Sequence, residues 1–244
     1  MNIELMTDIL KNADKIVFFG GAGMSTESGI PDFRSENGLY RTADGSQYSP
    51  ETMLSHSFFV SHTDEFYKYY KSKMICQDAK PNAGHIALAK LEESQKLKAV
   101  VTQNIDGLHQ LAGSKKVYEL HGSVHRNYCT KCRTFYDLDY IVNAIGTPHC
   151  MKCNSIVKPD VVLYEEPLND EVVNGAVNAI RNADVLIIGG TSLVVYPAAG
   201  LINYFRGEKL ILINKSPTPY DSRADLVIND SVGKVLETAV KSIL

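Results

Sequence analysis

Five short apolar runs constrain the fold of this chain more than any other feature of its sequence. The runs are rich in β-branched residues, are bounded by polar residues or glycine, and cover residues 15–20, 98–103, 184–189, 209–214 and 224–228. Continuous apolar runs of this length are typical of parallel strands that are buried on both faces. Amphipathic stretches with helical spacing lie between or after them, at 84–95, 168–182 and 232–244. The alternation predicts an α/β fold with a doubly wound, parallel, Rossmann-like sheet.

Two segments interrupt this alternation. Residues 34–80 are polar and aromatic, and residues 121–157 carry two cysteine pairs and few apolar side chains. We predict that the two insertions form a smaller, discontinuous domain of zinc-ribbon and helical type. Residues 1–33, 81–120 and 158–244 would form the large domain. A cleft between two domains is a common place for a ligand.

The cysteine pairs have the spacing of two zinc knuckles, Cys129-Thr-Lys-Cys132 and Cys150-Met-Lys-Cys153. Four thiolates suit tetrahedral Zn²⁺, and four sulfur ligands leave no open position for a water or a substrate. We therefore expect a structural metal that folds a segment with little core of its own. A thioredoxin-like redox pair and incidental cysteines are the alternatives, and both fit two such pairs less well. The fifth cysteine, Cys76, reads as a small, partly buried residue.

The charge of the chain limits its partners. The formal net charge is −3 over 244 residues, which argues against nucleic acid or an anionic membrane as the main partner but not against basic peptides. Glu4 and Asp8 stand where a secretory signal would be basic. We expect a cytoplasmic protein, in which the thiols stay reduced, and a monomer.

A glycine-rich turn follows the first predicted strand, at Gly20-Gly-Ala-Gly-Met-Ser-Thr26. Such a turn lets the backbone approach a pyrophosphate at a helix N-terminus. Thr26 occupies the third glycine position of the full dinucleotide motif, and the usual acidic ribose ligand has no second strand on which to sit. A tight turn without a ligand therefore remains an alternative.

Four further polar clusters lie at or just after predicted strand ends. They are Gly29-Ile-Pro-Asp-Phe-Arg34, Thr102-Gln-Asn-Ile-Asp-Gly-Leu-His109, Glu119-Leu-His-Gly122 and Gly189-Gly-Thr-Ser-Leu-Val-Val-Tyr-Pro-Ala-Ala199. The carboxyl edge of an open α/β sheet is where ligands bind. The clusters therefore predict one shared binding site.

In this order, the glycine turn, the polar clusters and the four cysteines resemble the sirtuin family of NAD-dependent protein deacylases, and in detail its short bacterial members. The resemblance extends from Ile16 to the last helix. It implies NAD as co-substrate, structural Zn²⁺, and acyl-lysine proteins or peptides as substrates. In the family, the acyl oxygen attacks the ribose as nicotinamide leaves, and the acyl group ends on ADP-ribose.

The resemblance also assigns roles to residues. His121 would be the general base and Asn104 a second catalytic residue; an imidazole suits the task because its pKa lies near working pH. For an isolated histidine, a satisfied core or loop position would be the preferred reading. Asn104 and Asp106 would hold the ribose and the nicotinamide amide, and Phe33 would cover the reaction centre. The full set of implied NAD contacts is Ala22, Thr26, Phe33, Arg34, Gln103, Asn104, Ile105, Asp106, His121, Thr191, Ser192, Asn214, Lys215 and Val232.

The substrate strand of the family matches Val161-Val-Leu-Tyr-Glu-Glu166. The resemblance implies that Val161, Val162, Tyr164 and Glu165 contact the peptide through β-augmentation. Tyr164 and Glu165 stand where the family usually has Phe and Gly. Because the change adds a carboxylate, we hypothesise that Glu165 favours basic residues beside the acyl-lysine.

The acyl group is expected to be short and neutral. Family members that prefer succinyl or malonyl groups carry a Tyr and an Arg three residues apart. Here Tyr40 and Arg41 are adjacent, and residues 67–70 lie on a predicted helix with lysines. Two other functions compete with deacetylation, namely protein mono-ADP-ribosyl transfer and a non-catalytic NAD or zinc interaction module. The combination of His121, Asn104 and Asp106 disfavours the non-catalytic module.

Overall fold

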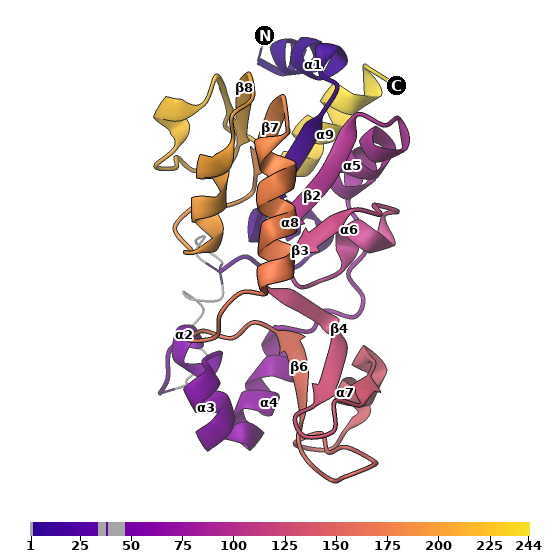
Figure 1. Ribbon diagram of the computed structural model, residues 1–244, viewed down its shortest axis with the longest axis vertical. Coiled ribbons are helices and arrows are strands. Elements are labelled where there is room, and N and C mark those ends of the chain that lie inside the picture. The colour runs from indigo at the N-terminus through magenta and orange to yellow at the C-terminus, as the bar shows by residue number, and fades with distance from the viewer. Residues whose placement is uncertain (1, 34–37, 39–46) are drawn as a thin grey trace.

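The computed structural model describes residues 2–33, 38 and 47–244. Figure 1 shows a large body built on one sheet and a smaller body below it, with both termini at the far end of the large body. The large sheet has six strands in the order β3-β2-β1-β7-β8-β9, and all neighbouring strands are parallel. The strands are β1 (Ile16–Gly20), β2 (Leu97–Thr102), β3 (Val117–Glu119), β7 (Val185–Gly189), β8 (Lys209–Ile213) and β9 (Leu226–Ile228).

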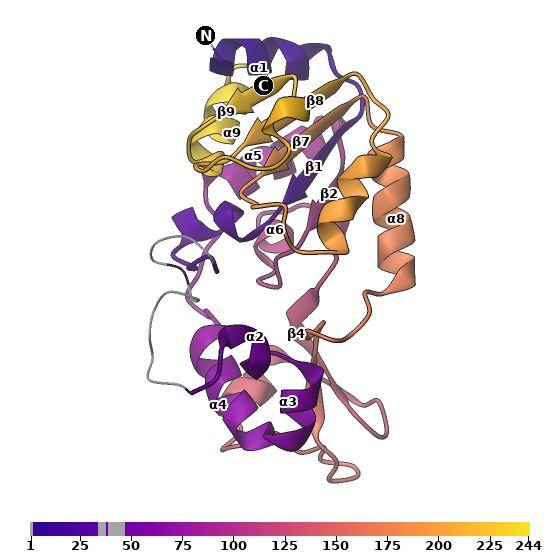
Figure 2. The ribbon, with the colours of Figure 1, turned by 90° about the vertical axis from the view of Figure 1, so that its left-hand side faces the viewer.

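The five predicted strands all lie in this sheet, so the predicted fold class is confirmed. Side chains alternate between its two faces. Phe18 of β1 packs into one core, whereas its neighbours Val17 and Phe19 pack into the other. The first core is covered by α1 (Asn2–Asn12), α5 (Ala83–Glu93) and α9 (Val232–Lys241), and the second by α8 (Asp170–Arg181) and the 3-10 helix η3 (Ala198–Tyr204). Figure 2 shows α8 and α5 on opposite sides of the strands.

The smaller body has an antiparallel sheet in the order β5-β4-β6, formed by β4 (Gly122–Cys129), β5 (Phe135–Tyr136) and β6 (Val157–Val161). Its helices are α2 (Pro50–Met53), α3 (His56–Ser61), α4 (Thr63–Lys73) and α7 (Leu138–Asn143). One aromatic core joins the two insertions, because Phe66, Tyr67 and Tyr70 of α4 pack in the same cluster as Val157 and Ile141. The expected domain boundary at residue 158 falls inside β6, which pairs with β4.

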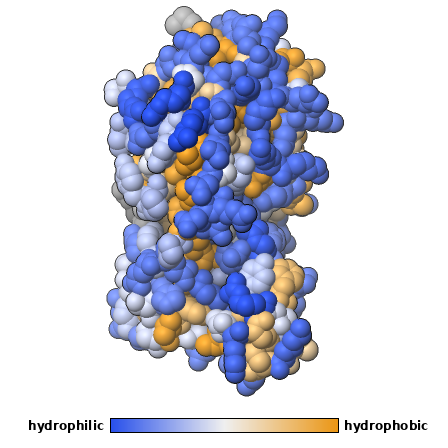
Figure 3. Space-filling view, viewed as in Figure 1, coloured by the Kyte–Doolittle hydropathy of each residue, from blue (hydrophilic) through white to orange (hydrophobic). Residues whose placement is uncertain are grey.

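Short elements complete the chain. They are the 3-10 turns η1 (Ala22–Met24), η2 (Thr26–Ser28) and η4 (Asp221–Arg223), and the helix α6 (Leu108–Leu111). The face in Figure 3 is mostly hydrophilic, with a hydrophobic strip down its middle. Among the described residues, no helix is both long and apolar enough to span a bilayer.

The order of the strands places a topological switch point beside β1. From β1 the chain builds β2 and β3 on one side, and later β7, β8 and β9 on the other. The chain segments that follow β1 and β7 therefore continue to opposite sides of the sheet, which makes this carboxyl edge the expected place for a ligand.

Asn82 connects the glycine turn after β1 to the start of α5. Its Oδ1 accepts hydrogen bonds from the amides of Gly84 (3.0 Å) and His85 (3.4 Å), which caps α5. Its Nδ2 donates to the carbonyl of Met24 (2.8 Å) and to Ser28 Oγ (3.0 Å). One side chain thus satisfies a helix end and positions the turn after β1.

We predict that Asn82→Ala lowers the free energy of unfolding by about 1–2 kcal/mol, because it removes the cap and leaves the Met24 carbonyl without its donor. Asn82→Ser is the matched control, since it keeps a neutral capping oxygen and loses the amide donors. Urea denaturation followed by circular dichroism measures both. A loss for Asn82→Ala no larger than that for Asn82→Ser would contradict the capping role.

Candidate functional site

A cavity of about 1520 Å³ lies between the two bodies. It exceeds the roughly 300–1,000 Å³ of an ordinary small-molecule site, so it has room for a dinucleotide and a second substrate. Every predicted NAD-binding residue that the structure describes lines it: Ala22, Thr26, Phe33, Gln103, Asn104, Ile105, Asp106, His121, Thr191, Ser192, Asn214, Lys215 and Val232. The remaining predicted contact, Arg34, lies outside the described residues, as do Tyr40 and Arg41.

Glycines bring the loops after β1 and β7 into close contact at the switch point. The amide of Gly23 donates to the carbonyl of Gly190 over 2.8 Å. A Cβ on Gly23 would lie 2.7 Å from the Cα of Gly190, which itself has a left-handed φ of 62°. Only glycine meets both demands without strain. The two loops therefore expose backbone at the edge of the cavity, and phosphate binding there stays a prediction.

A hydrogen-bonded trio forms the floor of the site. Ser25 Oγ donates to Asp106 Oδ2 over 2.7 Å, and Asn104 Nδ2 donates to Ser25 Oγ over 3.0 Å. The other Asp106 oxygen accepts from the amide of Leu108 (2.9 Å), which fixes the carboxylate at the start of α6. Ser25 was not among the predicted site residues, yet it is only 1% exposed and bonds to two of them. Its place within the glycine turn was the one available signal.

Thr26 stabilises the glycine turn itself, which is the alternative to a role in NAD binding. Its Oγ1 donates to the carbonyl of Gly23 over 3.1 Å, within the turn, while the residue also lines the cavity. Across the switch point, Gln103 Nε2 donates to Thr191 Oγ1 over 3.0 Å. This bond joins the ends of β2 and β7 across β1, which lies between them in the sheet.

The imidazole of His121 is oriented by one hydrogen bond. Its Nδ1 lies 2.9 Å from the carbonyl oxygen of Gln103. A carbonyl can only accept, so in the neutral ring the proton is assigned to Nδ1, and Nε2 keeps a free lone pair. Burial lowers the pKa of His121, and the bond to Gln103 offsets this in part. The ring is therefore neutral near pH 7 and available as a base.

The far half of the cavity lies at the ends of β8 and α9. Asn214 follows β8, and its Nδ2 donates to the carbonyl of Ser216 over 2.7 Å, which shapes the loop that carries Lys215. Val232 is 3% exposed at the start of α9 and offers an apolar wall. Polar groups beside an apolar wall suit a nucleoside, which has a hydrophilic sugar and a flat base.

The predicted substrate residues Val161, Val162, Tyr164 and Glu165 also line the cavity. The strand β6 ends at Val161, earlier than expected, because the chain then turns: the amide of Glu166 donates to the carbonyl of Leu163 over 3.0 Å. The Glu165 carboxylate points to α3, where it accepts bonds from Ser57. The amide of Val162 donates to the carbonyl of His121 over 2.9 Å, so this segment lies directly beside the imidazole-bearing residue.

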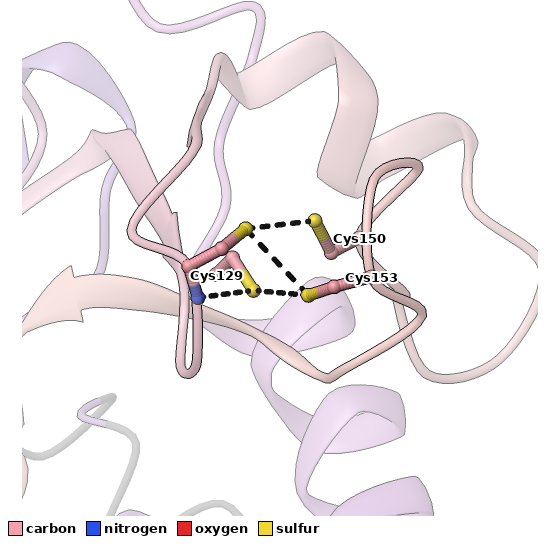
Figure 4. Close-up of side chains that lie close together, drawn as sticks. Cys129, Cys150 and Cys153 are labelled. Carbon is pink, nitrogen blue, oxygen red and sulfur yellow. Dashed lines mark hydrogen bonds between the residues drawn. The ribbon is translucent and has the colours of Figure 1, made fainter.

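The four predicted zinc ligands converge at the far end of the small body. The sulfur atoms of Cys129, Cys132, Cys150 and Cys153 lie within 4.8 Å of one another. Figure 4 shows the side chains of Cys129, Cys150 and Cys153 turned towards one another. The Sγ atoms of Cys129 and Cys153 are 3.4 Å apart. A tetrahedral ion with Zn–S bonds of about 2.3 Å would separate its sulfurs by about 3.8 Å, so the cluster is a possible metal site that fits Zn²⁺.

Backbone amides support the cluster. The amides of Lys131 and Cys132 both point to Cys129 Sγ at 3.4 Å. Donors of this kind stabilise thiolates that bind a metal. Four sulfurs complete the coordination of zinc, so the metal would hold the small domain together and take no part in chemistry.

We predict that the purified protein contains one zinc ion per chain and that Cys132→Ser lowers both its metal content and its melting temperature, because one of four thiolates is lost. Elemental analysis by mass spectrometry and thermal unfolding measure the two effects. The fifth cysteine supplies the control, since Cys76→Ser should keep the zinc. Full zinc occupancy in Cys132→Ser would refute the assignment.

Comparisons with known proteins agree with this geometry. Residues 21–197 match the family model described as the Sir2 family. A Clostridium acetobutylicum protein named NAD-dependent protein deacetylase is 65% identical over 239 residues, with 98% of each chain covered. A Clostridium perfringens protein of the same name is 66% identical over 235 residues, with 96% of each covered.

Two solved structures show the same fold. One holds Sir2 with a p53 peptide and NAD⁺; it has a TM-score of 0.87 and 40% identity, and the match covers 99% of this chain and 98% of that one. The other is a Sir2 variant with a deacetylated p53 peptide and 3′-O-acetyl-ADP-ribose, with a TM-score of 0.91, 38% identity and the same coverage. The family match over most of the sequence and the nearly full-length relatives show that the chain belongs to the Sir2 family.

Proposed function

We propose that this protein is an NAD-dependent protein-lysine deacetylase that transfers the acetyl group to ADP-ribose and releases nicotinamide. The observation that carries the proposal is the place of His121. Its free Nε2 belongs to a neutral ring that lines the same cavity as the glycine turns and the Ser25–Asp106–Asn104 trio. The relatives named NAD-dependent protein deacetylase support the same activity.

The proposed reaction has two stages. The acetyl oxygen of the substrate lysine attacks the ribose carbon as the bond to nicotinamide breaks, and Asn104 and Asp106 hold the sugar and the carboxamide. His121 Nε2 then takes a proton from a ribose hydroxyl, whose oxygen attacks the acetyl carbon. Water completes the release of free lysine, and the acetyl group remains on ADP-ribose. Phe33 would cover the reaction centre and hinder the return of nicotinamide.

An acidic acyl group finds no free arginine in the described part of the cavity. Among the described residues that line the cavity, Arg126 is the single arginine, and it is paired with Glu119 (2.6 Å) and Asp160 (2.8 Å). To bind Arg126, a succinyl carboxylate would have to displace one of these partners. Tyr67 and Tyr70 are buried in the core of the small body and do not line the cavity. We therefore propose short neutral acyl groups as substrates.

A cytoplasmic location and a monomeric state remain part of this proposal. Reduced thiols are needed for the cysteine cluster to bind a metal, and cytoplasmic conditions keep thiols reduced. Size-exclusion chromatography with light scattering would measure the oligomeric state directly.

We predict that His121→Ala lowers kcat/KM for an acetyl-lysine peptide by about 10²–10⁴-fold, the usual contribution of a general base. Affinity for NAD should change little, because other side chains and backbone hold the dinucleotide. Mass spectrometry of the products measures turnover, and calorimetry measures NAD binding.

The wild-type protein provides the test of reaction type. Nicotinamide release that depends on acetyl-peptide, together with O-acetyl-ADP-ribose, is the expected result. Release without peptide, with ADP-ribose attached to protein, would instead indicate a mono-ADP-ribosyltransferase. No release under either condition would refute an enzymatic role and leave a binding module.

We also predict faster turnover of acetyl-lysine than of succinyl-lysine in peptides of identical sequence, because the carboxylate of the succinyl group finds no unpaired arginine among the described cavity residues. Competition between the two peptides for limiting enzyme gives the ratio of kcat/KM values directly. Preference for the succinyl peptide would overturn the assignment of acyl group.

A further inference from the structure

We infer that Glu165 is a positioning residue, whose carboxylate fastens the substrate-facing segment 162–166 to the start of α3 and does not select the charge of the substrate. The inference rests on the proposed deacetylase function. It replaces the hypothesis that Glu165 attracts basic residues beside the acyl-lysine. Three sets of contacts and one backbone conformation carry it.

The backbone of the segment is bonded to the first residue of α3 and to Leu54 just before this helix. The amide of Tyr164 donates to the carbonyl of Leu54 over 3.0 Å, and the amide of His56 donates to the carbonyl of Tyr164 over 3.0 Å. These bonds use both backbone groups of Tyr164 within the protein. A peptide that adds a strand here must therefore pair with the neighbouring residues, whose position depends on this contact.

The Glu165 carboxylate makes the next contact with a single oxygen. Its Oε2 accepts the amide of Ser57 at 2.9 Å and the hydroxyl of Ser57 at 2.7 Å. Ser57 lies in the first turn of α3, where amides have no helical partner and a negative charge is favourable. These two bonds lower the pKa of Glu165, the hydroxyl bond more than the amide bond.

The backbone of Glu165 has a conformation that is unfavourable for residues other than glycine, so contacts of its side chain must stabilise it. Its φ is 76°, in the left-handed region that glycine adopts freely and larger residues avoid. A non-glycine residue keeps such a conformation only where surrounding contacts enforce it. The two bonds to Ser57 are contacts of this kind, and glycine at the same position could not make them.

The carboxylate of Glu166 also bonds to groups around the segment, and we call the contacts of Glu165 and Glu166 together the clamp. Its carboxylate accepts bonds from His56 Nδ1 (2.8 Å), Lys158 Nζ (3.0 Å) and the amide of Leu163 (2.9 Å). The segment that both glutamates hold then bonds to the carbonyl of His121 through the amide of Val162. The clamp therefore sets the distance between the peptide-binding backbone and the proposed base.

The rival explanation is also visible in the structure. Glu165 and Glu51 line a shallow groove of about 480 Å³ on the small body, together with Phe58 and Tyr164. Because the Glu165 side chain is solvent-exposed, a basic residue of the substrate could reach it. The two roles differ in what they need: positioning needs an acceptor oxygen, whereas charge selection needs a negative charge.

Three variants separate these roles. Glu165→Gln keeps a carbonyl oxygen that can accept both bonds from Ser57 but removes the charge. Glu165→Ala removes the oxygen and the charge together, and Ser57→Ala removes one donor from the other side. Each is assayed with acetyl-lysine peptides whose flanking residues are lysine, alanine or aspartate, and KM for peptide and KM for NAD are measured separately.

We expect Glu165→Ala to raise KM for all three peptides by about fivefold, with KM for NAD changed less than about twofold, since one charge-assisted contact to the peptide platform is lost. Glu165→Gln should recover most of this loss, equally for every flank. Ser57→Ala as a single variant should raise KM for peptide. In the Glu165→Ala background it should raise KM little further, because the two residues share one interaction.

Hydrogen exchange of the Leu163 and Tyr164 amides provides a readout that does not depend on turnover. Exchange should be faster in Glu165→Ala than in wild type and close to wild type in Glu165→Gln. If the wild-type protein shows no deacetylation, the proposed function fails, yet the exchange rates still test the clamp. Loss confined to the lysine-flanked peptide, and equal in Glu165→Gln and Glu165→Ala, would overturn the inference, as would unchanged exchange in Glu165→Ala.

Discussion

The hydrogen bond between the Gln103 carbonyl and His121 Nδ1 is the contact on which the site depends. Gln103 follows β2 of the large sheet, and His121 directly precedes β4 of the small sheet, so the bond stands where the chain passes from one body to the other. It sets the tautomer of the imidazole and turns Nε2 away from the backbone. Burial of the same ring keeps it neutral near pH 7. Orientation and basicity thus come from one local arrangement.

The rest of the fold supplies the two surfaces that this imidazole needs. The large sheet offers backbone at the β1 and β7 turns, where Gly23 and Gly190 meet. The small body offers the segment after β6, which bonds to the His121 carbonyl. One hydrophobic core, rich in aromatic side chains, packs the helices of that small body against its sheet, and the cluster of four thiols lies at its far end. The proposed reaction site lies in the cavity between the bodies, and the possible metal site lies away from it.

Much of this could be predicted from the sequence because parallel strands that are buried on both faces appear as short, continuous apolar runs. The five apolar runs, the cysteine spacing and the polar clusters at strand ends all depend on local sequence. Other features depend on contacts between distant residues and leave no such record. Ser25 touches Asp106 across 81 positions, β3 has only three half-buried residues, and Glu165 finds its partner in Ser57. Glu165 stands where the family usually has glycine, which marked it as unusual, but its contact with Ser57 could be found only from the structure.

The most direct test of this account is the tautomer of His121. Nitrogen-15 NMR of histidine-labelled protein distinguishes the two ring nitrogens, and a His121→Asn variant identifies the signal by its loss. We expect a neutral ring at pH 7 with the proton on Nδ1 and a free Nε2. A ring protonated on Nε2, or an imidazolium at that pH, would contradict the proposed role of His121, because no lone pair would then face the cavity.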